Sequence, residues 1–192
     1  CLCGDLLGAM KPLKIANQSL AWGEHTYVMG ILNATPDSFS GDGLLTSGGA
    51  LEQAKTFVEA GADILDVGGE STRPGSEPVD ADEEIRRVIP IIRAISEEMP
   101  DILISVDTYK ASVAEAALNA GAHIVNDVWG LRADPELASV VARFGCPVIL
   151  MHNRSNPASV EVRDQLGNAY IGAEYENLLE EVKAELLESV QI

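Results

Sequence analysis

The chain has 192 residues, of which 46% are hydrophobic and 22% charged, a composition typical of a globular domain with a sizeable core. Its formal net charge of −17 argues against nucleic-acid binding, and no apolar run reaches the ~18–20 residues of a membrane span. The three cysteines have no partners at metal-ligand spacing, so we expect a protein of the reducing cytoplasm without a disulfide framework.

The N-terminal end is expected to contribute little to the fold. Residues 1–12 are interpreted as a disordered or non-native leader, because the first ten lack the basic start of a signal peptide and Met10 is a natural start. A short β-hairpin is expected between this leader and the first buried strand. The chain, residues 1–192, is assigned to a single domain.

Strands and helices are then predicted to alternate along the chain. The apolar, β-branched runs are nearly continuous, which is typical of parallel strands covered on both faces. They lie at Val28–Leu32, Ile64–Val67, Ile102–Val106, Ile124–Val128 and Pro147–Met151. Helices are predicted over Ser47–Ala60, Asp82–Glu97, Lys110–Ala120, a stretch that is capped by Asp134 and stops at Gly145, and Ala173–Val190.

This alternation implies right-handed crossovers and a parallel sheet, which fits both a doubly wound sheet and a (β/α)₈ barrel. Polar residues at the carboxyl ends of successive strands favour the barrel, whose active site lies on that rim. They are Asn33, Asp107, Asn126 and His152. No G-x-G-x-x-G opens a helix, as a dinucleotide-binding sheet would require. A whole barrel needs ~250 residues, so we expect an incomplete TIM-type α/β barrel of about five strand–helix units.

Three segments resemble dihydropteroate synthase, a family of pterin-binding (β/α)₈ barrels in folate synthesis. They are MGILNATPDSFS at residues 29–40, GADILDVGGESTRPG at 61–75, and ISVDTYK at 104–110 followed by IVND at 124–127. PVILMHN at 147–153 supports them. The resemblance covers nearly everything from Trp22 to the end, and it implies a pterin-binding barrel truncated at its C-terminus.

The resemblance implies a transferase that joins (7,8-dihydropterin-6-yl)methyl diphosphate to 4-aminobenzoate and releases diphosphate. Asp107 and Asn126 match the family's catalytic and pterin-binding residues, and Asn33 matches its ligand to Mg²⁺. A fixed carboxylate suits this chemistry because positive charge builds on the pterin as diphosphate leaves. An amide offers the ring both a donor and an acceptor.

Further substrate-binding residues are implied by the family's two active-site loops and by its fifth strand. Phe39 matches the first loop, Thr72, Arg73 and Pro74 match the second, and Met151 is the last residue of the predicted strand. After Ser-Phe-Ser the chain has Gly41-Asp42-Gly43 where the family has Asp-Gly-Gly, and the extra glycine is expected to loosen this loop. In the family, a further aspartate, a lysine, an arginine and a histidine come from later strands, and full-length members form homodimers.

Two other functions fit part of the pattern. A methyltransferase that passes a methyl group from a folate to a corrinoid would share Asp107 and Asn126 but would not need residues 33–43 or 69–74. A catalytically inactive fragment would account for the missing later strands.

Several residues near the motifs have structural explanations. Asp66 and Asp127 are interpreted as interior hydrogen-bonding residues, and His152 either as part of the pocket or as a backbone partner. His25 and His123 are interpreted as structural or exposed. Lys110, at the start of a helix, is expected to be solvated.

Overall fold

The computed structural model describes residues 11–34, 47–70, 78–154 and 175–192. The first elements are β1 (Leu13–Ile15), β2 (Gln18–Leu20), β3 (Met29–Asn33), α2 (Ser47–Glu59), β4 (Ile64–Gly68) and α3 (Ala81–Glu98). They are followed by β5 (Leu103–Asp107), α4 (Ala111–Ala120), β6 (Ile124–Asp127), α5 (Leu137–Phe144), β7 (Val148–Leu150) and α6 (Leu178–Val190). Among these helices none is long and apolar enough to cross a membrane.

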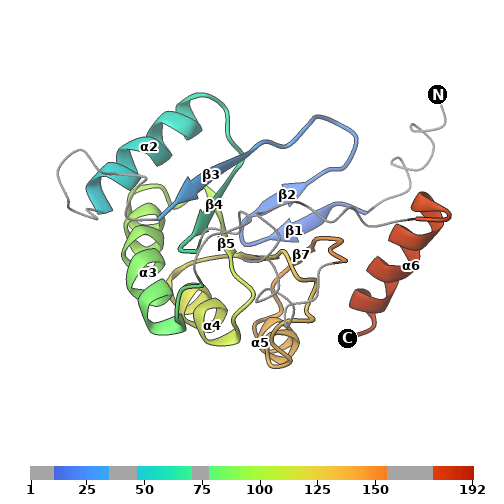
Figure 1. Ribbon diagram of the computed structural model, residues 1–192. Helices are drawn as coiled ribbons and strands as arrows, with labels where there is room; N and C mark the ends of the chain where they lie inside the picture. The colour runs from blue at the N-terminus through green and yellow to red at the C-terminus, as the bar shows by residue number, and fades with distance from the viewer. Residues whose placement is uncertain (1–10, 35–46, 71–77, 155–174) are drawn as a thin grey trace.

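Five parallel strands form one sheet in the order β3-β4-β5-β6-β7, and β1 and β2 form a separate antiparallel hairpin. This arrangement confirms the predicted incomplete α/β barrel with a short hairpin at its N-terminal end. Helices α2 to α5 lie in sequence along one side of the sheet, and the hairpin lies on its other side (Figure 1). Each predicted strand lies within two residues of its observed bounds.

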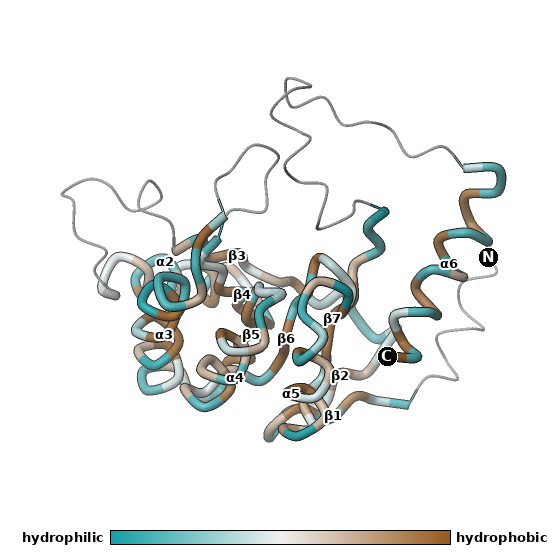
Figure 2. The backbone as a smooth tube through the Cα atoms, turned by 60° about the horizontal axis from the view of Figure 1, so that its bottom comes forward, coloured by the Kyte–Doolittle hydropathy of each residue, from teal (hydrophilic) through white to brown (hydrophobic). Residues whose placement is uncertain are grey.

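Alternate residues of each strand face two different environments. On the outer face Leu65, Val67, Ile104 and Val106 belong to the main core, which the helices cover. On the inner face Ile64, Leu103 and Ile124 pack against Ile15 and Leu20 of the hairpin. The hairpin therefore covers the inner face at the N-terminal end of the strands, and the inner face near their C-terminal ends carries polar residues (Figure 2 shows the hydropathy along the backbone).

Local capping fixes the helix ends. Asp80 caps α3 by accepting a hydrogen bond from the Glu83 amide at 2.8 Å, and α3 continues through Pro90 without a break. Gly121 and Gly145 end α4 and α5 in the left-handed conformation that favours glycine.

The start of helix α5 was predicted wrongly. We expected Asp134 to cap it, but α5 begins only at Leu137. One Asp134 carboxylate oxygen accepts from the Glu136 amide at 3.0 Å and the other from the Ala111 amide at 2.8 Å. Asp134 therefore also satisfies the first free amide of the preceding helix α4, whose own cap residue Lys110 makes no capping bond.

Two adjacent glycines let other groups approach the end of β4. A Cβ atom on Gly69 would lie 2.9 Å from both Glu84 Cγ and Val88 Cγ1 of α3, which is too close. On Gly68 it would meet the Asp107 carboxyl oxygen at 3.4 Å. The end of β4 thus packs tightly against α3 on one face and against Asp107 on the other.

We predict that Gly69→Ala lowers the free energy of unfolding by roughly 1–3 kcal/mol, because α3 must move away to admit the methyl group. Gly48→Ala is the matched control, since a Cβ atom on this residue of α2 would have no neighbour within 4 Å. The control should be neutral or stabilise by about 0.5 kcal/mol. Urea denaturation measures both; equal effects would show that the close approach at Gly69 does not restrict packing.

Candidate functional site

The carboxyl ends of four strands bring the main candidate residues into one row. Asn33 pairs in register with Gly68, Gly68 with Asp107, and Asp107 with Asn126. Because alternate residues of a strand share a face, this row lies on the inner face, above the row that contains Asp66 and Ser105. The structure therefore places Asn33, Asp107 and Asn126 at one end of the sheet, as a barrel rim requires.

Asp107 lies in a crowded acidic environment. Burial raises the pKa of its carboxyl group to about 7, and the negative charges of Asp66, Glu84, Asp127 and Glu70 contribute in the same direction. Its Oδ1 atom is buried and has no hydrogen-bond partner. A carboxyl group of this kind ionises near neutral pH and readily accepts a donor from a ligand.

Asn126 is oriented by a carboxylate one row below. Its Nδ2 atom donates to Asp66 Oδ2 at 3.0 Å, and Asp66 is only 3% exposed. Burial raises the pKa of Asp66 as well. With its amide nitrogen turned toward Asp66, Asn126 has its carbonyl oxygen available as an acceptor. Asp66 is thus an interior hydrogen-bonding residue, as the sequence predicted.

Three buried side-chain oxygens in the described part of the chain lack hydrogen-bond partners. They are Asp66 Oδ1, Ser105 Oγ and Asp107 Oδ1. All three side chains belong to the inner face of β4 and β5, on adjacent rows. The Ser105 hydroxyl lowers the pKa of Asp66 as a hydrogen-bond partner does, so these two groups can satisfy each other. Buried polar groups are normally satisfied, so the remaining Asp107 Oδ1 indicates a place for a polar ligand beside Asn126.

Other predicted residues have structural roles or lie elsewhere. Asp127 accepts from the Trp129 and Leu131 amides at 2.8 and 2.6 Å and so stabilises a turn, as expected. His123 accepts from the Ile104 amide and is likewise structural. His152 Nε2 lies 2.7 Å from Glu185 Oε2 of α6, a side-chain contact that was not among its expected roles.

The remaining substrate-binding candidates are only partly described. Met151 follows β7 and is 44% exposed, so it is available to contact a ligand. The other four, together with the glycine-rich departure in the first loop, lie outside the described residues: Phe39, Thr72, Arg73, Pro74 and the segment 41–43.

The prediction that Lys110 is solvated is wrong. Its side chain is only 15% exposed, and Nζ lies 2.5 Å from both Glu70 Oε2 and Glu84 Oε2. Sequence reasoning missed this cluster. A signal was present, because a lysine at a helix N-terminus opposes the helix dipole and needs another reason to be there.

Asn33 is the residue that could hold a metal ion. Its side chain is exposed at the end of β3 and offers one oxygen ligand. Residues 11–34, 47–70, 78–154 and 175–192 contain no group of three or more His, Cys, Asp or Glu side chains that could enclose a metal. A single oxygen donor fits Mg²⁺, which keeps several waters and is usually bound through one or two protein ligands plus substrate phosphates.

Comparisons with known proteins identify the family and the fold. The family model described as pterin binding enzyme matches residues 29–192. The curated dihydropteroate synthase of Clostridium beijerinckii is 47% identical over 181 residues, which are 94% of this chain and 61% of that protein. The crystal structure of the Clostridium difficile dihydropteroate synthase in the presence of pteroic acid has a TM-score of 0.75 and 47% identity, with 88% of this chain and 59% of that chain covered.

A more distant structure has the same fold. The dihydropteroate synthase of Yersinia pestis with a sulfonamide drug complex has a TM-score of 0.77 and 35% identity, and covers 94% of this chain and 61% of that chain. The chain therefore spans about three fifths of the length of each of these three relatives.

The raised pKa of Asp107 predicts a pH-dependent stability. The folded chain binds this proton more tightly than the unfolded chain, whose carboxyl has its ordinary pKa near 3.8. Stability from this group is present below about pH 4 and is lost as the pH rises toward 7. We expect Asp107→Asn, which cannot ionise, to raise the free energy of unfolding at pH 8 by at most about 4 kcal/mol and to change it little at pH 4. Urea denaturation at both pH values measures this, and equal shifts at the two would exclude charge as the cause.

Proposed function

The chain belongs to the family of pterin-binding enzymes, and we propose that its residues form part of a dihydropteroate synthase site. The reaction transfers a pterinylmethyl group from dihydropterin diphosphate to the amino group of 4-aminobenzoate. The bond between the methylene carbon and the diphosphate oxygen breaks, a carbon–nitrogen bond forms, and the amine loses a proton. The observation that carries the proposal is the half-buried pair of Asp107 and Asn126 on one row of the inner face.

The Asp107 carboxylate suits the pterin ring for two reasons. Ring N–H groups satisfy its unpartnered Oδ1 atom, and its negative charge stabilises the positive charge that develops on the ring as diphosphate leaves. Because the site is fixed in place before the substrate arrives, this stabilisation needs no reorganisation. Ring binding requires the ionised form, so activity should rise with pH through the Asp107 pKa of about 7.

Asn126 completes the recognition of the heterocycle. Its orientation is set by the 3.0 Å bond to Asp66, which leaves the amide oxygen to accept a ring N–H. An acceptor and a carboxylate side by side match the adjacent N–H groups of a pterin edge. The structure of the Clostridium difficile relative in the presence of pteroic acid supports a pterin as the ligand class.

Mg²⁺ is proposed as the cofactor, with Asn33 as its protein ligand. When bound, the ion would neutralise the departing diphosphate. Asn33 stands on the same inner-face row as Asp107 but two strands away, so the diphosphate end of the substrate would lie toward β3 and the ring toward β5 and β6.

The remaining features of the enzyme are proposed from the resemblance and the relatives. Phe39, Thr72, Arg73, Pro74 and Met151 would contact the substrates, and sulfonamides would compete with 4-aminobenzoate, as the drug complex of the Yersinia pestis relative suggests. A cytoplasmic location and a homodimeric full-length protein complete the proposal.

The function is tested by joining the chain at Ile192 to the remaining part of the Clostridium beijerinckii relative and measuring diphosphate release with both substrates and Mg²⁺. We expect turnover, and a loss of about 100- to 1,000-fold for Asp107→Asn in the same folded protein. Asp101→Asn, the same change at an exposed aspartate, is the control and should retain activity. Turnover of the Asp107 variant within a few-fold of the parent would refute the assigned role.

The metal assignment has its own test. Asn33→Ala should raise the Mg²⁺ concentration needed for half-maximal turnover by about tenfold or more, since few protein ligands hold the ion. The exposed side chain makes a loss of folding unexpected, and circular dichroism checks this. An unchanged Mg²⁺ requirement would show that the ion is held by other groups.

A further inference from the structure

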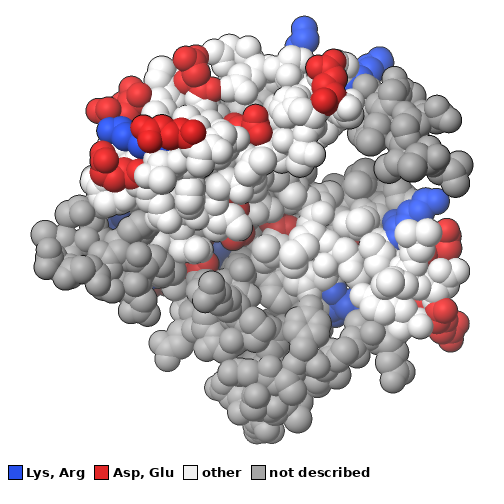
Figure 3. All heavy atoms as spheres, turned by 90° about the horizontal axis from the view of Figure 1, so that it is seen from above, with Lys and Arg blue, Asp and Glu red and all other residues white. Residues whose placement is uncertain are grey.

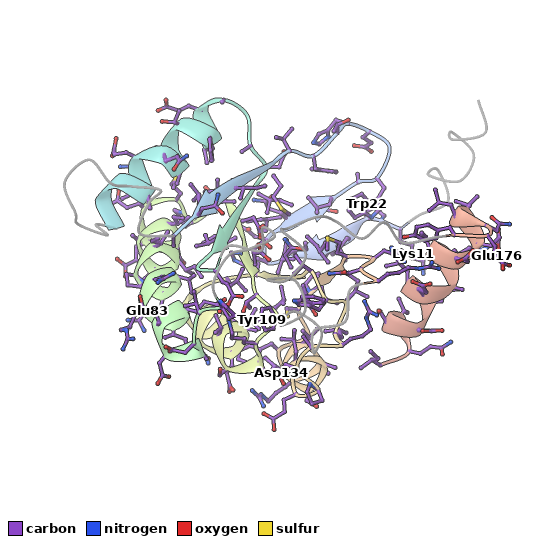
Figure 4. The ribbon with its side chains drawn as sticks, in the orientation of Figure 1. Lys11, Trp22, Glu83, Tyr109, Asp134 and Glu176 are labelled. Atoms are coloured by element: carbon purple, nitrogen blue, oxygen red, sulfur yellow. The ribbon has the colours of Figure 1, made fainter. Side chains whose placement is uncertain are left out.

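Lys110 makes a buried contact that the proposed chemistry does not use. It stands at the N-terminus of α4, where a positive charge opposes the helix dipole, and it makes no capping bond. Its ammonium group instead lies 2.5 Å from Glu70 and from Glu84 and 4.5 Å from the centre of the Tyr109 ring. Figure 4 labels Tyr109, whose hydroxyl also lies 3.2 Å from Glu70 Oε1. Lys110 is therefore positioned by its acidic partners and not by the helix.

Glu84 lies on the α3 side of β4, whereas Asp107 lies on the side of the candidate site. Glu84 packs against the backbone of Gly69, and Asp107 packs against Gly68. Because neither glycine has a side chain, only the backbone of one strand separates Glu84 from Asp107. Glu84 is 1% exposed, so water poorly screens the repulsion between its carboxylate and that of Asp107.

The charged groups around Asp107 are mostly negative. Asp66 comes from β4, Glu70 from the end of β4, Glu84 from α3 and Asp127 from β6, and all of them raise its pKa. Two arginines lie nearby, but Arg87 is bound to the Gly69 carbonyl and to Glu83, and the charge of Arg132 acts on Asp127. Figure 3 shows the molecule from above, where acidic side chains, with basic ones beside them, lie in the recessed middle of the visible face.

We propose that Lys110 is a positioning residue that neutralises Glu70 and Glu84 at the end of β4 and thereby keeps the Asp107 carboxylate available in its charged form. It acts through those carboxylates and does not contact the substrate. Its effect on turnover rests on the proposed function, whereas its effect on the ionisation of Asp107 does not. Lys110 would thus set the lower pH limit at which the pterin site can work.

The ionisation of Asp107 can be followed without any substrate. The difference in unfolding free energy between each variant and the same variant carrying Asp107→Asn is measured against pH in the 192-residue chain. Lys110→Met changes the charge of the Lys110, Glu70 and Glu84 group from −1 to −2, and Glu84→Gln changes it to 0. The pH at the midpoint of this curve reports the ionisation of Asp107. We expect this midpoint to rise by about one pH unit in Lys110→Met and to fall by a similar amount in Glu84→Gln.

Two further variants separate this role from a structural one. Lys110→Met combined with Glu84→Gln restores the charge to −1 and should return the midpoint close to the parent value, and Lys110→Arg should keep it there. Loss of packing would not produce shifts of opposite sign that cancel in the double variant. If Lys110→Met fails to fold, Glu84→Gln alone decides the question. A midpoint unmoved in Glu84→Gln overturns the proposal.

Turnover of the completed barrel provides the second readout. The acidic limb of its pH profile should shift upward about one unit in Lys110→Met and downward in Glu84→Gln, with little change at the pH optimum. If the parent barrel releases no diphosphate, the proposed function fails while the stability measurement still tests Lys110. If the parent is active and the acidic limb moves in neither variant, the role of Lys110 is refuted and the function stands.

Discussion

The repulsion between carboxylates at the end of β4 and β5 is the constraint on which the site depends. Asp107 is useful because it is held away from water in a fixed place, and the same confinement raises its pKa to about 7. The nearby Glu84 is 1% exposed, so its negative charge adds to the electrostatic repulsion on Asp107. Burying like charges is tolerated only with a compensating cation, which Lys110 supplies at 2.5 Å. Stability and chemistry therefore compete at one strand end.

The sequence predicted the elements that depend on local pattern. The five strands followed from continuous apolar runs, and the row of Asn33, Asp107 and Asn126 followed from polar residues at strand ends, because parallel strands in register bring such residues together. The interior role of Asp66 could be predicted for the same reason, since a carboxylate inside an apolar strand needs a hydrogen-bond partner.

Contacts between distant elements could not be predicted in the same way. The burial of Lys110 depends on how α3 packs against β4, through residues 26 and 40 positions away. The start of α5 was misplaced because Asp134 bonds to the amide of Ala111, a partner that no local cap rule includes. In α6, Ser189 is the single buried residue. Glu181 and Glu185 of the same helix form ion pairs with Arg154, so the helix is held by charge contacts and not by an apolar core.

The bond from Asp134 to Ala111 has a consequence for how such barrels can be rearranged. Repeated strand–helix units invite the view that each is a module that can be exchanged or duplicated separately. Here one unit provides the cap for the helix of the unit before it (Figure 4 labels Asp134). A recombination breakpoint between α4 and Asp134 would leave the first amide of α4 without its partner. The segment from α4 to Asp134 should therefore be transferred together when such units are exchanged.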